Sequence, residues 1–110
     1  MRALVVSALA DDYAGVAVED LPVPEPGPGQ VLVRVRAAGV NFPDLLQTRG
    51  EYQHKPDLPF VTGLEMSGEV AALGEGVEGW RIGEAVVGGV RQGGMAEYAI
   101  AAAQALRRKP

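Results

Sequence analysis

A glycine-rich stretch is the first place in this sequence where residue spacing matches a known binding chemistry. It reads Gly74-Glu75-Gly76-Val77-Glu78-Gly79, the G-x-G-x-x-G spacing of dinucleotide-binding loops, and Glu97 lies downstream near the distance of a ribose-binding acid. Such a loop must open a helix whose free N–H groups hold a pyrophosphate. Here Trp80-Arg81-Ile82-Gly83, a valine pair and two glycines follow, which leaves no room for a helix of normal length. We therefore predict a turn between two strands.

Two residues with polar side chains, Asn41 and Tyr52, lie just after a predicted strand and in a predicted loop, respectively. Asn41 follows a strand candidate, with Gly39 before it and Pro43 after it. By spacing alone, its side chain would cap a short helix or form an Asx turn. Tyr52 lies in a predicted loop, where a tyrosine is commonly a partly buried packing residue with its hydroxyl in water. An unperturbed phenol has a pKa of ~10, so at neutral pH this side chain could also donate a proton.

The composition excludes several other kinds of site. The chain has no cysteine, which removes disulfides, thiolate nucleophiles and cysteine-based zinc sites. Its single histidine, His54, cannot assemble a metal site from soft ligands, and we expect it to be a solvated loop residue. A net charge of -4 offers no attraction to nucleic acid or to anionic membranes. We predict no metal, no nucleic-acid partner and no membrane partner.

The N-terminus resembles a secretory signal peptide but is too short to be one. The apolar stretch from Ala3 to Ala10 is shorter than a signal of roughly 15–30 residues, and it fits a buried first strand better. No run approaches the ~20 apolar residues that span a membrane. We expect a cytoplasmic protein.

Short strands separated by turns must position these residues. Fifteen glycines and eight prolines in 110 residues favour turns, and the proline-rich stretch from Leu21 to Gly29 favours an extended connection. A short helix is predicted at Phe42–Arg49, a loop at Glu51–Thr62 and a further short element at Ala102–Lys109. Strands are predicted at Met1–Ala8, Gln30–Ala38, Glu65–Leu73, Gly83–Val87 and Met95–Ala101. This pattern favours a single mainly β domain, residues 1–110, that forms a small barrel or sandwich.

Several motifs occur together in the order of one enzyme family. They are Val40-Asn41-Phe42-x-Asp44, Arg49-Gly50-x-Tyr52, Leu58-Pro59-Phe60-Val61-x-Gly63-x-Glu65-x-x-Gly68-x-Val70, Gly74-x-Gly76-Val77 and Gly94-Met95-Ala96-Glu97-Tyr98. The chain resembles the N-terminal GroES-like domain of the medium-chain dehydrogenase/reductase superfamily. Zinc alcohol dehydrogenases of that superfamily carry a cysteine at the position of Asn41 and a histidine at that of Leu64. An amide and an aliphatic chain cannot replace these zinc ligands. The resemblance is therefore to the zinc-free quinone oxidoreductase branch.

This resemblance implies a fold and a site. The fold would be a GroES-like, partly open β-barrel with one or two short helices, forming the substrate side of the cleft. Asn41 would line the cleft near the nicotinamide of NADPH, where its amide could donate a hydrogen bond to the cofactor ribose or to a substrate carbonyl. Tyr52 matches a tyrosine proposed as the proton donor in related enoyl thioester reductases. Leu46 stands where some quinone reductases have a cleft tyrosine, and Pro43 replaces the proton-relay residue of zinc relatives.

The remaining charged residues are predicted to have structural roles. Asp44 would be an early-helix charge and Glu65 the partner of an arginine. Arg49 could attract an anionic cofactor, but we expect a solvated arginine at a helix end. The run Arg107-Arg108-Lys109 is too short for a nucleic-acid site, and we expect it to mark an exposed terminus.

The function implied by the resemblance is metal-free hydride transfer from NADPH to a quinone, an enone or an enoyl thioester. The full enzymes of this family also contain a Rossmann domain, which the 110 residues lack. We therefore expect a fragment or an excised domain that binds NADPH poorly and is inactive alone. The alternative is a non-catalytic structural or interaction module that uses its exposed cleft to form a homo-oligomer or to bind another chain.

Overall fold

The fold is that of a computed structural model, which describes residues 1–10, 12–39, 48–49, 57–90 and 92–108. Strands dominate these residues, and the predicted mainly β class is confirmed. The elements are β1 (Arg2–Val6), β2 (Val16–Asp20), β3 (Gln30–Ala38), β4 (Phe60–Val61), β5 (Glu65–Leu73), β6 (Ala85–Gly89), β7 (Tyr98–Ala102), the 3-10 helix η1 (Ala103–Ala105) and β8 (Leu106–Arg108).

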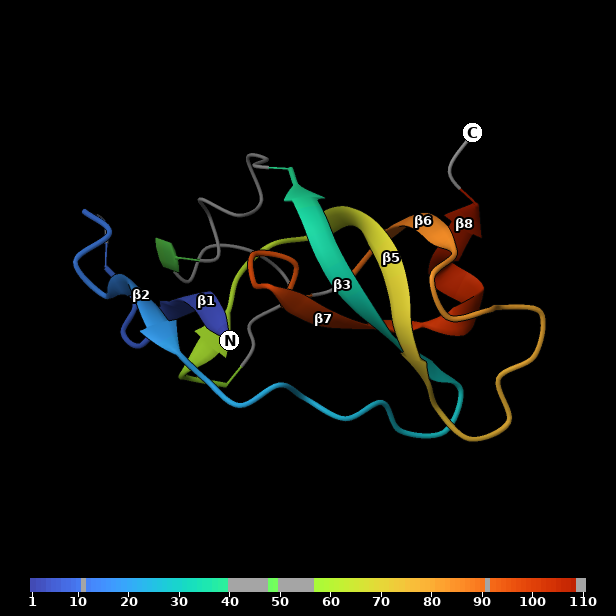
Figure 1. The fold of residues 1–110 in the computed structure, drawn as a ribbon. Coiled ribbons are helices and arrows are strands. Elements are labelled where there is room, and N and C mark those ends of the chain that lie inside the picture. Colours follow the sequence, from blue (N-terminus) through green and yellow to red (C-terminus); the bar gives the residue numbers. More distant parts are fainter. Residues whose placement is uncertain (11, 40–47, 50–56, 91, 109–110) are drawn as a thin grey trace.

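The strands form two antiparallel sheets. The smaller has the order β2-β1-β4 and the larger the order β7-β3-β5-β6-β8. Figure 1 shows the small sheet at one end of an elongated molecule and the β6–β8 edge at the other. A bridge between Ala3 and Ala96 joins the sheets, supported by a 2.9 Å hydrogen bond from Leu4 N to Met95 O. The sheets do not close, so the predicted partly open barrel is confirmed.

The core lies between the central strands β3 and β5. Val31 and Val33 of β3 are fully buried and pack with Met66 and Val70 of β5, as their alternating pattern predicts. Five consecutive pairs in β5–β6 and three in β6–β8 extend this sheet outward, and Val86 and Leu106 complete its apolar face. Burial of this continuous valine-rich face holds the larger sheet together.

The glycine-rich stretch is a turn, as predicted. Gly74 N donates to Gln30 O at 2.7 Å, and no helix follows before β6. A Cβ at Gly74 would lie 1.9 Å from Gly27 O, and Gly76 has a φ of +79°. The glycines therefore serve a close backbone approach and a left-handed turn rather than a pyrophosphate.

Some elements differ from the prediction. The strand β2 was not predicted, because four of its five residues are exposed and its position depends on pairing with β1. The two-residue strand β4 lies inside the predicted loop Glu51–Thr62 and also depends on β1. Strands β6 and β7 begin two and three residues later than predicted, respectively, and the predicted C-terminal element consists of η1 and β8.

Of the predicted helix Phe42–Arg49, Thr48 and Arg49 are helical, and the rest lies outside the described residues. In the part of the chain that the structure describes, no helix is long and apolar enough to cross a membrane.

Candidate functional site

The end of β3 and the start of β5 meet at one corner of the larger sheet. Gly39 N donates to Glu65 O at 3.2 Å, and Val90 N donates to Leu64 O at 2.8 Å. Leu64 is half-buried. Asn41 lies two residues beyond Gly39 in the sequence. The corner therefore joins Leu64 to the residues that lead into Asn41.

A close backbone approach fixes the path of the chain into Leu64. Gly63 has a φ of +110°, and a Cβ there would lie 2.5 Å from Met95 N. Gly94 N donates to Gly63 O at 3.0 Å, and Met95 N donates to Thr62 O at 2.9 Å. Because glycine has no side chain, these two segments can pack backbone against backbone. The Thr62 hydroxyl, next to this contact, is buried without a hydrogen-bond partner among the described residues.

The two residues predicted to carry the chemistry are not placed by the structure. Asn41 and Tyr52 lie outside the described residues, and so do Pro43, Asp44, Leu46 and His54. Their roles stay predictions.

Glu65 is exposed, and its predicted arginine partner is not found within the described ranges. The side-chain ion pairs found there instead join Arg36 to Glu69 and Arg108 to Glu84.

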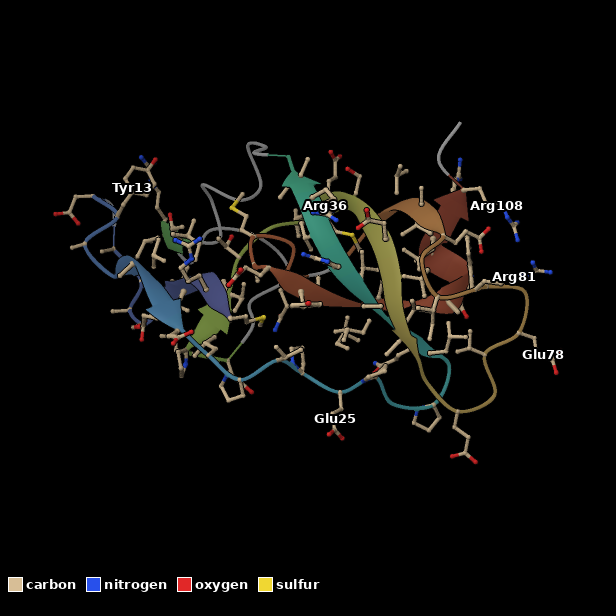
Figure 2. All side chains as sticks on the ribbon, viewed as in Figure 1. Tyr13, Glu25, Arg36, Glu78, Arg81 and Arg108 are labelled. Atoms are coloured by element: carbon tan, nitrogen blue, oxygen red, sulfur yellow. The ribbon has the colours of Figure 1, made fainter. Side chains whose placement is uncertain are left out.

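Arg36 projects from the last third of β3, close to the corner (Figure 2). Its Nε lies 2.8 Å and 3.1 Å from the two carboxylate oxygens of Glu69 on the neighbouring strand. The hydrogen bond to Glu69, followed by charge attraction, raises the pKa of the Arg36 guanidinium above its ordinary value. This cross-strand pair therefore ties the end of β3 to β5.

The loop between β1 and β2 contacts Thr48 and Arg49, which lie between Asn41 and Tyr52 in the sequence. Ala10 N donates to Thr48 O at 3.0 Å, and the Arg49 guanidinium lies 6.0 Å from the ring centroid of Tyr13. Tyr13 has a φ of 61°, an uncommon conformation for a residue other than glycine. The exposed Arg49 was predicted as a solvated helix-end residue, so its contact with Tyr13 was missed.

Arg107 and Arg108 are exposed, as predicted, and Arg108 is also held in place by several contacts. Its Nε lies 2.6 Å from Glu84 Oε2, its Nη2 donates to Gly79 O at 2.8 Å, and its guanidinium stacks 4.9 Å from the Trp80 ring centroid. We call Arg108, Glu84 and Trp80 the β8 clamp. Trp80 Nε1 also donates to Ala103 O at 3.2 Å. The exposure of Arg107 and Arg108 is as predicted, whereas these contacts were not predicted, because the partners lie more than twenty residues away in the sequence.

A groove of about 650 Å³ lies against the corner and includes Gly39 and Glu65 in its lining. The residues with polar side chains in its lining are Glu65, Ser67 and Arg107. Within the described residues, no three His, Cys, Asp or Glu side chains are grouped as a metal site requires.

The chain belongs to the alcohol dehydrogenase GroES-like domain family. The model of that family matches residues 27–110. The quinone oxidoreductase of Lama guanicoe is 38% identical over 111 aligned positions, which include all of this chain and 34% of that protein. The predicted resemblance to the quinone oxidoreductase branch is thereby confirmed.

Solved structures agree with this assignment. The human synaptic vesicle membrane protein VAT-1 homolog-like protein superposes with a TM-score of 0.94 at 34% identity, covering this whole chain and 35% of that one. The quinone oxidoreductase from Thermus thermophilus, solved also in complex with NADPH, gives a TM-score of 0.82 at 34% identity and is covered over 32% of its length. The chain thus spans about a third of the length of these relatives.

Proposed function

We propose that this chain is the substrate-side domain of an NADPH-dependent quinone or enone oxidoreductase. The observation that carries the proposal is the match of this whole chain to about a third of the length of quinone oxidoreductases, one of them solved in complex with NADPH. The corner between Gly39 and Glu65 supports it, because it brings Leu64 to the strand end that precedes Asn41. The redox reaction and the use of NADPH are proposals for the longer protein.

The proposed chemistry divides between two side chains and the cofactor. NADPH would supply a hydride to a ring carbon of the quinone or to the β-carbon of the enone. Asn41 would donate an amide hydrogen bond to the substrate carbonyl oxygen, on which negative charge develops. Tyr52 would deliver the proton that completes the reduction. With Asn41 and Leu64 in place of cysteine and histidine, hydrogen bonding would replace the polarising role of zinc.

The test compares the chain alone with a fusion to the nucleotide-binding part of a quinone oxidoreductase relative. NADPH oxidation with a benzoquinone acceptor should be absent for the 110-residue chain and present for the fusion. In the fusion, Asn41→Asp removes the amide donor at nearly constant size and should lower kcat by about 100-fold. His54→Ala is the matched control and should retain activity. Turnover by the chain alone, or full activity of Asn41→Asp, would contradict the proposal.

An enoyl thioester reductase is the closest alternative enzyme, because it shares the Gly-x-Tyr motif at Tyr52. In the same fusion, Tyr52→Phe separates the two functions. It should suppress reduction of an enoyl thioester, whose carbon must be protonated by the enzyme, more than reduction of a quinone.

A non-catalytic interaction module is the second candidate, favoured by exposed apolar surface. Ile82 is 70% exposed and Val18 68% exposed. A larger, mainly apolar groove of about 1070 Å³ lies between the Leu21–Pro24 segment and β7. Exposed apolar surface of this kind favours association. Light scattering that finds a strict monomer at high concentration would argue against this candidate.

A further inference from the structure

The groove beside the corner combines two opposite charges with a floor of small residues. Only Glu65, Ser67 and Arg107 bring hydrogen-bonding side chains to it. The other lining residues are small or apolar: Ala37, Ala38, Gly39, Met66, Val87, Gly88, Gly89 and Ala105. A ligand in the groove would therefore meet one cation, one anion and one hydroxyl.

The strand register places these three groups on the same side of the sheet. Ala37, Ser67, Val87 and Arg107 are paired in one row across β3, β5, β6 and β8. Because neighbouring strands lie ~4.8 Å apart, the Cα atoms of Ser67 and Arg107 are separated by roughly 10 Å. Glu65 stands two residues before Ser67 on β5 and so faces the same side.

Of the two consecutive glycines at the groove, Gly88 allows close packing on the core side and Gly89 leaves the groove open. A Cβ at Gly88 would lie 2.7 Å from Leu106 Cδ2, so a glycine is needed where β6 meets β8. A Cβ at Gly89 would lie 3.6 Å from Leu64 O, an ordinary contact. A side chain at position 89 is therefore tolerated by the backbone and would occupy space that the groove now offers to a ligand.

The polar groups of the groove are not engaged elsewhere within the described ranges. Arg36 and Arg108 are paired with carboxylates there, whereas neither Arg107 nor Glu65 forms an ion pair. Arg107 and Glu65 are exposed, and Ser67 is half-buried. The β8 clamp holds Arg108 on the side of Trp80, and alternation along the strand then turns Arg107 toward the groove.

We propose that this groove binds a sugar phosphate. Arg107 holds the phosphate, because a guanidinium presents paired N–H donors that match phosphate oxygens. Glu65 and Ser67 bind the sugar hydroxyls, since a carboxylate accepts several hydrogen bonds and a serine hydroxyl both donates and accepts. Glu65 also repels a bare polyanion, which disfavours pyrophosphate as the preferred ligand. The inference goes beyond the proposed redox function, because binding of a sugar phosphate in this groove does not require hydride transfer.

The test is a titration of the 110-residue chain with ribose 5-phosphate, followed by amide NMR. Saturable shifts are expected at the groove residues, with a Kd on the order of 1 mM. Arg107→Met should weaken binding at least about tenfold, the equivalent of one lost charge-assisted contact. Arg34→Met is the matched control: it removes an exposed strand arginine that does not line the groove and should leave the Kd unchanged.

Two further variants separate the parts of the site. Glu65→Gln should weaken binding of ribose 5-phosphate but strengthen binding of inorganic phosphate, because the repelling charge is gone. Gly89→Val should abolish binding while the amide shifts of the core valines persist, which distinguishes a filled groove from an unfolded chain.

Any of three results would overturn the proposal. Wild type and Arg107→Met could bind ribose 5-phosphate with equal affinity, the amide shifts could map outside the groove, or pyrophosphate could bind more tightly than ribose 5-phosphate. The two proposals can fail separately. If the chain binds ribose 5-phosphate as expected but the fusion does not oxidise NADPH, the result supports sugar-phosphate binding in the groove and refutes the proposed redox function.

Discussion

The β8 clamp makes a quantitative prediction for Arg108→Met, a change that keeps the aliphatic stem and removes the guanidinium. The ion pair with Glu84 is partly exposed, with side-chain exposures of 65% for Arg108 and 23% for Glu84, and such pairs contribute about 0.2–1 kcal/mol. Stacking on Trp80 adds about 0.5–1 kcal/mol, and the bond to Gly79 O about 0.5–1.5 kcal/mol. Because one solvated side chain makes all three contacts, we expect a total of about 1–2 kcal/mol.

Urea unfolding followed by fluorescence measures this loss directly. Trp80 is the single tryptophan, so its emission reports on the clamp without further labels. The free energy of unfolding should fall by about 1–2 kcal/mol, and the melting temperature by about 4–8 °C for each kcal/mol. High salt should reduce the difference in the free energy of unfolding between wild type and Arg108→Met, because salt screens the ion pair with Glu84.

Arg81→Met is the matched control, since Arg81 projects near the same end of the molecule but its guanidinium forms no ion pair or stacking contact in the part described here (Figure 2). It should change the free energy of unfolding by less than about 0.5 kcal/mol. Identical unfolding midpoints for the Arg108 and Arg81 variants would refute the clamp.

Backbone and hydroxyl geometry give two more stability predictions, both measured by urea unfolding. Thr62→Val should stabilise the chain by about 1 kcal/mol. It replaces a buried hydroxyl, which has no hydrogen-bond partner among the described residues, with a methyl group of similar size. A loss of stability would mean that the hydroxyl is hydrogen-bonded. Gly74→Ala should destabilise the chain by more than Gly76→Ala, because its Cβ would collide with Gly27 O while that of Gly76 meets no atom within 4 Å. The cost at Gly76 should be about 1 kcal/mol, from its positive φ alone, and the reverse order would contradict the geometry.

The central strands could be predicted from the sequence because their evidence is local. Strands β3 and β5 have the predicted bounds, Gln30–Ala38 and Glu65–Leu73, since alternating apolar residues and flanking turns define each without reference to the rest of the chain. Strands β2 and β4 could not be found in this way. Their residues show no comparable alternation, and both are strands because β1 offers them unpaired N–H and C=O groups.

The candidate site likewise has one part that the sequence predicts and one part that it does not. The motifs around Asn41 and Leu64 predict one cleft, and the described part of it is the bond from Gly39 N to Glu65 O, which brings the end of β3 beside the start of β5. The groove was not predicted, because Ser67 and Arg107 are forty residues apart and only the register of the three strands β5, β6 and β8 aligns them. Arg107 had no distinguishing neighbour in the sequence, so its run of positive charge suggested only a solvated terminus.

Three consecutive residues of β8 connect the core, the clamp and the groove. Leu106 is buried in the core, Arg107 lines the groove and Arg108 stacks on Trp80. Because side chains alternate between the two faces of a strand, a slip of one residue would turn Arg107 toward the core and withdraw Arg108 from Trp80. The clamp therefore opposes this slip, and the same contacts that stabilise the chain keep a cation beside the groove. Loss of the clamp in Arg108→Met should accordingly weaken ribose 5-phosphate binding as well, although Arg108 does not line the groove.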